Sequence, residues 1–383
     1  MINIHKQLLK EGYESYIIWG RGRKSINKGE IYLNDKFGVY YHALYSRLTG
    51  KTGFASKKST KRLINILKKI KPDIIHLHNI HGYYINIELL FNYIKENNIK
   101  VVWTLHDCWA FTGQCPHFTL ANCNKWEKQC CNCAMIKEYP KTIRDNSKWN
   151  YQMKKKLFSG VDMTIVTPSK WLANLVKKSF LGSYSIKVIN NGVDMNIFKP
   201  TKSNFRKKYN LLNKKIILGV ASIWDTRKGI RDYIELSKIL DDNYRIVLIG
   251  VTRHQLLKLP SNIVGILRTE NQTELAGIYT TADILFNPTY EDNYPTVNIE
   301  ALACGTPVLS YDTGGSTEFV SLIDNTDIQY VVEKRLIRQD IYLLKKYIDN
   351  AINTKIKITN KALLDKNTMI NEYIKLYNQI IMR

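Results

Sequence analysis

Apolar residues along this chain follow two patterns that alternate with each other. Short runs such as IILGVAS (216–222) and RIVLIG (245–250) are apolar throughout, as expected for strands that are buried on both faces. Between such runs, apolar residues recur with the period of amphipathic helices, as in Thr60–Ile70, Ile87–Asn97, Lys170–Phe180 and Ile230–Leu240. The alternation predicts an α/β fold with parallel sheets covered by helices on both faces.

The expected strands fall into two sets, which indicates two domains. The first set is Ser15–Trp19, Asp73–His78, Lys100–His106, Met163–Pro168 and Lys187–Asn190, and the second is Lys215–Ala221, Tyr244–Gly250, Asn262–Ile266, Asp283–Asn287 and Pro307–Tyr311. A turn signal at Asn191-Gly192, then Pro200 and a polar stretch, separates them. We expect two Rossmann-like domains facing across a cleft, 1–190 and 191–365, with a C-terminal helix at 366–383 that packs back on the first.

The first domain has an unusual start. A doubly wound half normally opens with a strand, a Gly-rich turn and then a helix, but here Ile2–Lys10 already has the pattern of that helix. Either the fold begins with a helix, or the first strand and its loop are missing from this chain. Residues 1–7 show no apolar signal-peptide core, and no apolar run is long enough to cross a bilayer. We therefore expect a cytoplasmic protein.

The formal net charge of +24 adds a possible partner to this picture. Lys and Arg cluster at 57–62, 68–71, 154–156 and 177–178. Such a field attracts anionic lipid, nucleic acid or phosphorylated substrates, and the alternative is an ordinary solvated surface. Because no recognition motif accompanies the charge, we expect no specific nucleic acid partner, but a peripheral position on the inner face of the cytoplasmic membrane.

A polar loop in the second domain leads from a strand into a helix. Pro288 ends the strand at 283–287, so the loop 290–295 is expected at the carboxyl end of the sheet, where ligands bind. Pro295 suits the first turn of the helix that follows, and this helix stops before Gly305. The free N–H groups at the helix start favour an anion.

Acidic and basic side chains surround this helix start. Glu300, within the helix, can accept hydrogen bonds from two adjacent hydroxyls such as those of a ribose. Glu291 or Asp292 can meet hydroxyls of a second sugar, and the alternative is that all three acids are ordinary helix residues. Arg227 and Lys228 end another strand and could hold a diphosphate from the opposite side. Two cations and a helix start can stabilise a departing diphosphate without a metal, so we expect no cofactor for catalysis.

The second half of the chain contains a series of motifs: VINNGVD (188–194) followed by Phe198 and Pro200, RKG (227–229), residues 291–300, ALACGTPV (301–308), and Gly314-Gly315 with Glu318. In this order, the motifs resemble those of the retaining glycosyltransferases of family 4, in particular the capsule and colanic-acid-type subgroup. The resemblance implies the GT-B arrangement of two Rossmann-like domains and a nucleotide diphosphate sugar of the UDP or GDP type as donor.

The resemblance also implies roles for individual residues. Glu300 would bind the donor's ribose, and Arg227 and Lys228 its diphosphate. The first acid would contact the donor sugar, and the family spacing leaves this role open between Glu291 and Asp292. The rest of the donor pocket would be formed by Asn293, Tyr294, Pro295, Thr296 and Val297, with main-chain N–H groups from 294 to 297.

The first domain contributes a histidine and a cysteine-rich segment. By the same resemblance, His106 would face the donor sugar with Asp107 orienting it, and the alternative is a capping Asp beside a packed His. His76, His78 and His81 are candidates for the acceptor side. Six of the seven cysteines lie within 108–133, and a C-x-x-C pair in a cytoplasmic loop favours structural zinc over disulfides. The expected ligands are Cys115, Cys123, Cys130 and Cys133, and packed reduced thiols are the alternative.

We therefore expect a retaining, metal-independent hexosyltransferase. It would move a hexose or N-acetylhexosamine from a nucleotide diphosphate sugar to a growing cell-surface glycan, such as a capsule, exopolysaccharide or O-antigen, on a glycan or lipid-linked acceptor. A sugar-nucleotide epimerase or a phosphorylase of the same fold is one alternative, because fold alone does not fix function. An N-terminally truncated, non-catalytic GT-B subunit is another.

Overall fold

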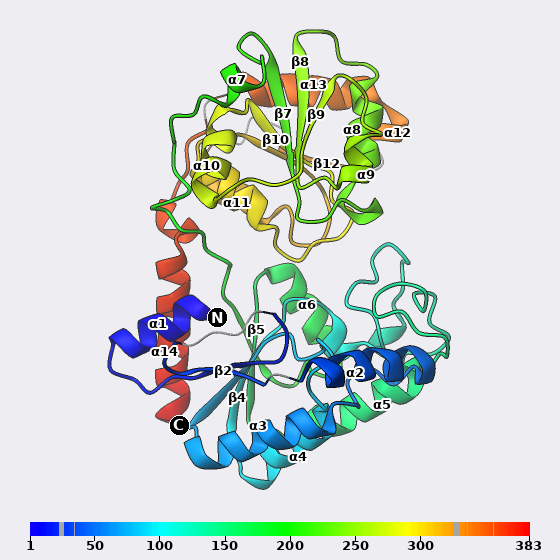
Figure 1. The fold of residues 1–383 in the computed structure, drawn as a ribbon, viewed down its shortest axis with the longest axis vertical. Helices are drawn as coiled ribbons and strands as arrows, with labels where there is room; N and C mark the ends of the chain where they lie inside the picture. The colour runs from blue at the N-terminus through cyan, green and yellow to red at the C-terminus, as the bar shows by residue number, and fades with distance from the viewer. Residues whose placement is uncertain (23–26, 34, 325–329, 335, 355) are drawn as a thin grey trace. The chain divides into compact units, whose positions relative to one another are not determined.

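The structure is a computed structural model that describes residues 1–22, 27–33, 35–324, 330–334, 336–354 and 356–383. The chain divides into two compact units (Figure 1). The first unit comprises Met1–Ile189 together with Ile370–Arg383, and the second comprises Asn190–Met369. Each unit is built on parallel strands with helices packed against them, so the α/β class expected from the sequence is confirmed.

The second unit contains one six-stranded sheet in the order β12-β11-β10-β7-β8-β9, and every neighbouring pair is parallel. Five of these strands lie within the ranges expected from the sequence, and the short edge strand β12 was not anticipated. The strands are β7 (Lys215–Val220), β8 (Tyr244–Ile249), β9 (Ile263–Ile266), β10 (Ile284–Asn287), β11 (Val308–Tyr311) and β12 (Val331–Val332).

Successive residues of these strands are buried in two different cores. Ile216 and Leu218 belong to one cluster, whereas Ile217 between them belongs to the other. The first cluster is completed by α10 (Gln272–Thr281) and α11 (Thr296–Ala303), and the second by α8 (Ile230–Ser237) and α13 (Ile341–Ile352). Because side chains alternate across a strand, this pattern places helices on both faces of the sheet. The short helices are α7 (Phe205–Lys208), α9 (Arg253–Leu256) and α12 (Leu336–Gln339).

The first unit contains two separate parallel sheets. One has four strands in the order β3-β4-β5-β6, and the other consists of β1 and β2 alone. The bounds are β1 (Ile17–Trp19), β2 (Glu30–Tyr32), β3 (Ile74–Leu77), β4 (Lys100–Thr104), β5 (Met163–Thr167) and β6 (Ser185–Val188). The last strand begins and ends two residues earlier than its expected range of 187–190.

Helices from both ends of the chain pack in the first unit (Figure 1). The C-terminal helix α14 places two tyrosines against the four-stranded sheet, where Tyr373 Oη lies 2.9 Å from Thr104 Oγ1 and Tyr377 Oη lies 2.6 Å from His76 Nδ1. The last segment of the chain thus covers one face of this sheet. The helices are α1 (Ile2–Lys10), α2 (Lys36–Thr49), α3 (Lys57–Ile70), α4 (Ile87–Glu96), α5 (Ser147–Phe158), α6 (Lys170–Lys178) and α14 (Lys366–Ile381).

Gly250, which follows β8, lies so close to the main chain of Ala221 that a side chain at this position can be tested for its effect on stability. Its φ is +92°, and a Cβ there would lie 1.7 Å from the carbonyl oxygen of Ala221. We expect Gly250→Ala to lower the Tm of the second unit by at least about 4 °C, because positive-φ strain alone costs about 1–3 kcal/mol and the neighbouring main chain must also move. Gly305→Ala is the matched control, since φ is +84° but the nearest atom is 3.9 Å away. Equal losses of Tm in the two variants, measured by calorimetry, would contradict this explanation.

Candidate active site

Two loops of the second unit meet because their strands are neighbours. β7 and β10 pair in parallel, so the loops that follow them leave the same edge of the sheet. The loop after β7 contains the short 3-10 helix η3 (Thr226–Lys228), at whose start Asp225 accepts the N–H of Lys228 at 2.9 Å. The N–H of Tyr290, in the loop after β10, donates to the carbonyl of Arg227 at 2.8 Å. The main chain therefore fixes the cation-bearing loop against the acid-bearing loop.

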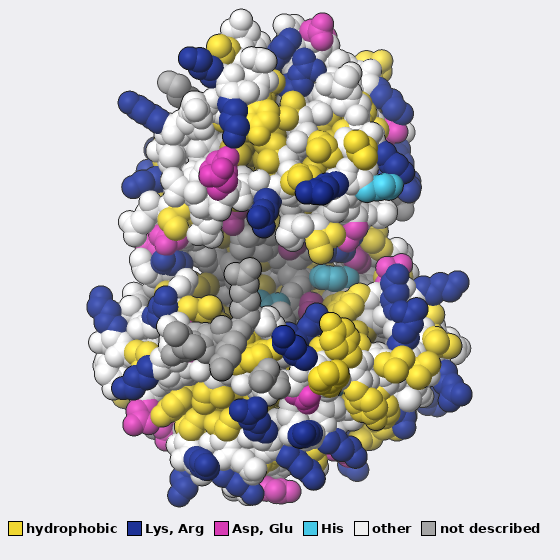
Figure 2. All heavy atoms as spheres, viewed as in Figure 1, with side chains coloured by type: hydrophobic (Ala, Val, Ile, Leu, Met, Phe, Trp, Pro, Cys, Tyr) yellow, Lys and Arg dark blue, Asp and Glu magenta, His cyan; other side chains and the backbone are white. Residues whose placement is uncertain are grey.

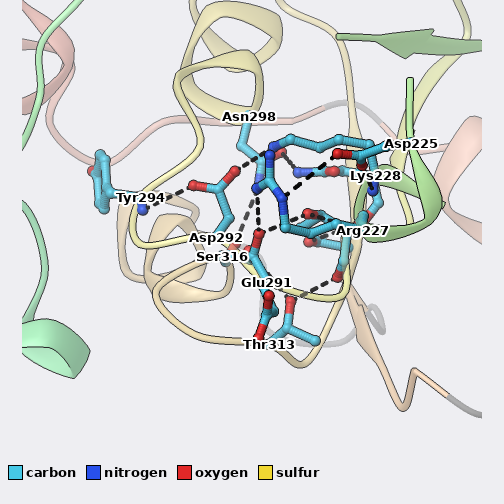
Figure 3. Close-up of polar contacts among 12 residues, drawn as sticks. Asp225, Arg227, Lys228, Glu291, Asp292, Tyr294, Asn298, Thr313 and Ser316 are labelled. Atoms are coloured by element: carbon cyan, nitrogen blue, oxygen red, sulfur yellow. Dashed lines mark hydrogen bonds and ion pairs between the residues drawn. The ribbon is translucent and has the colours of Figure 1, made fainter. Parts of the chain in front are cut away.

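The two cations expected to hold a diphosphate contact the acidic loop in this structure (Figure 3). Arg227 Nη1 donates to the carbonyl oxygen of Glu291 at 3.0 Å, and Lys228 Nζ lies 2.5 Å from Asp292 Oδ2. Both side chains of the ion pair are about four-fifths buried, with 21% of Lys228 and 18% of Asp292 exposed. The structure thus brings together Arg227, Lys228, Glu291 and Asp292, four of the residues that the sequence singled out.

The acidic loop is held in place by contacts that the sequence did not reveal. Asp292 Oδ1 accepts the N–H of Tyr294 at 3.2 Å, and its main-chain carbonyl accepts the N–H of Gly315 at 3.1 Å. Gly314 has a φ of +56°, and a Cβ there would lie 2.0 Å from the same carbonyl. The glycine pair noted in the sequence therefore permits the close approach of this loop. Glu291 is 3% exposed and Asn293 is 5% exposed, so the residues on both sides of Asp292 are buried.

The helix α11 begins at this loop and covers the range expected from the sequence. Pro295 is its N-cap residue, not a first-turn residue as expected, and no side chain caps this end of α11. Thr296 and Val297 form the first turn, so their N–H groups point toward the loop as the prediction requires. Asn298, which was missed, donates to the carbonyl of Ser316 at 2.9 Å and fixes the helix against the glycine-containing segment.

Glu300 lies on α11 and is hydrogen-bonded to Tyr279, a residue that the sequence analysis did not single out. Its Oε2 accepts a hydrogen bond from Tyr279 Oη at 2.9 Å, and Tyr279 comes from α10. Burial raises the pKa of Glu300 above its usual range, while hydrogen bonds from Tyr279 and Thr296 oppose this shift. A carboxylate accepts several hydrogen bonds, which suits a role in binding a vicinal pair of hydroxyls.

His78, His81 and His106, three of the histidines of the first unit, lie after the carboxyl ends of β3 and β4. His78 Nδ1 lies 3.0 Å from His106 Nε2, and His81 Nε2 lies 3.3 Å from an oxygen of Asp107. Asp107 also accepts the N–H of Trp109 at 2.9 Å, at the start of the 3-10 helix Trp109–Phe111. Burial lowers the pKa of His106, and the charge of Asp107 partly opposes that effect. Asp107 thus contacts the ring of His81 and the main chain of Trp109, and the N-cap residue of the 3-10 helix is Cys108.

The cysteine-rich segment does not have the geometry of the expected zinc site. Within the described part of the chain, no three His, Cys, Asp or Glu side chains are arranged to hold a metal. A hydrogen bond from the thiol of Cys115 lowers the pKa of Cys133 to about 7, and Cys130 Sγ accepts the N–H of Gly113 at 3.2 Å. Cys115, Cys123, Cys130 and Cys133 are all free thiols here, packed with or against the hydrophobic core of the first unit.

Comparison with known families matches both halves of the chain. Residues 1–197 match the family described as Glycosyltransferase Family 4, and residues 201–360 match Glycosyl transferases group 1. The chain belongs to Glycosyltransferase Family 4. The family 4 chain is 22% identical over 404 residues to WcaC of Escherichia coli K12, named as a colanic acid biosynthesis glycosyl transferase, and the match covers 99% of this chain and 95% of that protein.

Solved structures confirm the fold of this family 4 glycosyltransferase. The sucrose-phosphate synthase of Thermosynechococcus elongatus has a TM-score of 0.66 at 15% identity, covering 99% of this chain and 92% of the other. Anabaena HepE in complex with UDP-glucose has a TM-score of 0.54 at 14% identity, covering 84% and 82% of the two chains. Two Rossmann-like domains of the GT-B type are therefore established, as the sequence predicted.

The raised pKa of Glu300 gives a prediction about how the stability of the protein depends on pH. A carboxyl group whose pKa is raised on folding binds more protons in the folded state, so folded stability falls as the pH rises above the unfolded pKa. We expect Glu300→Gln to increase the Tm at pH 7 relative to the wild type, because it removes a desolvated charge and keeps an acceptor for Tyr279. The Tm difference should disappear near pH 4, where the carboxyl group is protonated. A lower Tm at pH 7 would contradict this account.

Proposed function

We propose that this glycosyltransferase moves a sugar from a nucleotide diphosphate sugar to a cell-surface glycan under construction. The observation that carries the proposal is the meeting of Arg227 and Lys228 with the acidic loop at the start of α11. This arrangement combines two cations, free N–H groups and hydroxyl-binding carboxylates in one place, which are the groups that a nucleotide diphosphate sugar needs. A relative named for colanic acid biosynthesis and a structural neighbour solved with UDP-glucose support the donor class and the glycan product.

The ion pair between Lys228 and Asp292 suggests how the donor enters. A diphosphate that takes the ammonium of Lys228 must displace the carboxylate of Asp292. Asp292 would then be available to accept hydrogen bonds from sugar hydroxyls, together with Glu291 beside it. Arg227 would bind the diphosphate with the fork of its guanidinium, and Glu300 would bind the ribose. His106 is proposed to contact the donor sugar, and this role rests on the resemblance to the family.

The proposed chemistry needs no metal. Charge develops on the departing diphosphate, where two cations and a helix start can stabilise it. We propose that the configuration of the donor sugar is retained, by departure and attack on one face, as the resemblance to the family implies. The acceptor would be a glycan or a lipid-linked glycan.

The exposed face of α2 supports a position at the membrane. Its outward face carries five large apolar side chains that are at least half exposed: Phe37, Tyr40, Tyr41, Leu44 and Leu48. Figure 2 shows hydrophobic side chains gathered over α2, with basic side chains nearby. The next helix, α3, begins with Lys57 and Lys58 and adds Lys61 and Arg62. Aromatic and basic side chains together favour adsorption to anionic lipid headgroups. None of the helices in the described ranges has the length and apolarity to cross a bilayer.

Calorimetric titration with UDP, GDP, ADP and CDP, with a chelator present, tests the function directly. We expect micromolar affinity for one nucleotide without a metal. The matching nucleotide sugar should then be consumed only when an acceptor glycan is supplied. Conversion of the sugar without an acceptor would indicate an epimerase, and the absence of any nucleotide binding by the folded chain would contradict the donor site.

The proposed diphosphate-binding pair of Arg227 and Lys228, called the diphosphate clamp below, is tested by the double variant Arg227→Ala with Lys228→Ala. We expect kcat to fall about 10²–10³-fold with a smaller change in nucleotide affinity, because the cations act most strongly on the charge that develops in the transition state. Lys238→Ala is the control, since that lysine is 62% exposed and pairs only with Glu235 among the described ion pairs. Turnover equal to that of the wild type in the double variant would remove the clamp from the mechanism.

Membrane adsorption is tested by the triple variant Tyr40→Ser, Tyr41→Ser and Leu44→Ser in vesicle sedimentation. We expect its partitioning to phosphatidylglycerol vesicles to fall more than about tenfold, because each removed side chain contributes about 1 kcal/mol of burial. The matched control carries serine at three exposed apolar positions of the second unit, Leu212, Leu257 and Tyr342. Equal losses in both proteins, or equal binding to neutral phosphatidylcholine, would contradict a specific role for α2.

A further inference from the structure

Glu300 is held by two hydroxyl groups that come from different helices. Tyr279 Oη, on α10, donates to Glu300 Oε2 at 2.9 Å, and the side chain of Thr296, one turn earlier on α11, is also hydrogen-bonded to Glu300. Helix side chains lean toward the N-terminal end of their helix, and a bond to the residue four positions earlier fixes this direction. The carboxylate is therefore held toward the start of α11, where the acidic loop joins the helix.

Tyr279 is itself fixed on both its side chain and its main chain. The side chain is completely buried, and the ring of Phe198 packs against it edge-on, with the two ring centroids 6.3 Å apart. The main-chain carbonyl accepts the hydroxyl of Thr306 at 2.6 Å, which ties α10 to the segment that follows α11. A hydroxyl group on so constrained a side chain defines the position of the oxygen that it binds.

Glu300 is less buried than Tyr279, and it is held in its charged form. Its side chain is only partly buried, and Thr296 is exposed, so the carboxylate can be reached from outside the core. Burial raises the pKa of Glu300, whereas the hydrogen bonds from Tyr279 and Thr296 lower it. Both hydroxyls therefore favour the ionised carboxylate, which accepts hydrogen bonds and donates none.

We infer that Tyr279 is a positioning residue that, with Thr296, holds Glu300 as the acceptor for both hydroxyls of a ribose. The pair thereby makes the site select nucleotides that carry these two hydroxyls. This inference rests on the proposed function, in which Glu300 binds the ribose, and it adds how that binding is enforced. A carboxylate offers about four acceptor positions, which is enough for Tyr279, Thr296 and a vicinal diol together. A site built to bind a hydroxyl rejects the analogue that lacks it, because its own polar groups lose a partner.

Calorimetric titration with paired nucleotides tests this selectivity. The nucleotide among UDP, GDP, ADP and CDP that binds is compared with its 2′,3′-dideoxy analogue, which lacks both hydroxyls. We expect the analogue to bind the wild type at least about tenfold more weakly. In Tyr279→Phe, the affinity for the ribonucleotide should fall about three- to tenfold, while that for the analogue should change less than about twofold.

Two further variants show whether the effect passes through the carboxylate. Tyr233→Phe is the matched control, because Tyr233 is equally buried but its hydroxyl donates to the main-chain carbonyl of Phe286. Both affinities should stay within about twofold of the wild type in this control. In a Glu300→Ala background, Tyr279→Phe should cause no further loss of ribonucleotide affinity, since the group that it positions is absent.

Thr296→Val gives the same test without a change in the core, because Thr296 is exposed. We expect it to weaken ribonucleotide binding and to leave binding of the dideoxy analogue unchanged, as Tyr279→Phe does. Unchanged ribonucleotide affinity in both variants would overturn the inference.

The outcomes separate this inference from the function on which it rests. If the folded wild type binds no nucleotide, the donor site and the inference are both wrong. If it binds the ribonucleotide and the dideoxy analogue equally, only the inference is wrong. Equal losses for the two ligands in Tyr279→Phe, or an undiminished loss in the Glu300→Ala background, would indicate a merely structural role for Tyr279 and would likewise overturn the inference alone.

Discussion

The candidate donor site depends on one constraint, the parallel pairing of β7 with β10 in the second unit. The register aligns Ile217 with Ile284, so the loops after both strands leave the sheet side by side. One loop carries the cations and the other carries the acids, although about 60 residues separate them in the sequence. The hydrogen bond from Tyr290 to the carbonyl of Arg227 then fixes their distance. Without this register, the residues of the site would be present in the chain but not together.

The sequence predicted those parts of the fold and site that depend on local pattern. Strands β7 and β8 are apolar apart from Lys215 and Arg245, and α11 is preceded by Pro295 and followed by Cys304-Gly305. Contacts between distant segments left no such signal. Nothing near Tyr279 indicates that its hydroxyl reaches Glu300, and nothing in 366–383 indicates that Tyr373 meets Thr104. The strand β6 was misplaced because its residues are largely exposed and lack the apolar pattern.

The start of the cysteine-rich segment is held by a buried lysine that the cysteine spacing does not indicate. Lys154 Nζ donates to the carbonyls of Trp109 and Thr112 at 2.7 and 3.1 Å and lies 3.4 Å from the centre of the Trp109 ring. Burial lowers the pKa of Lys154 to about 7. A lysine from α5 thus binds the first residues of the segment, a contact between distant parts of the chain that no local pattern indicates.

The Lys228–Asp292 ion pair also has a consequence for product release. Under the proposed function, transfer leaves a nucleoside diphosphate on the cations, and its negative charge would make it a strong competitor of the next donor. A carboxylate tethered 2.5 Å from the ammonium can take the place of the diphosphate as soon as it moves away. An internal anion of this kind lowers the affinity for donor and product alike. It thereby shortens the residence time of the product and limits product inhibition, at the cost of a higher donor concentration for saturation.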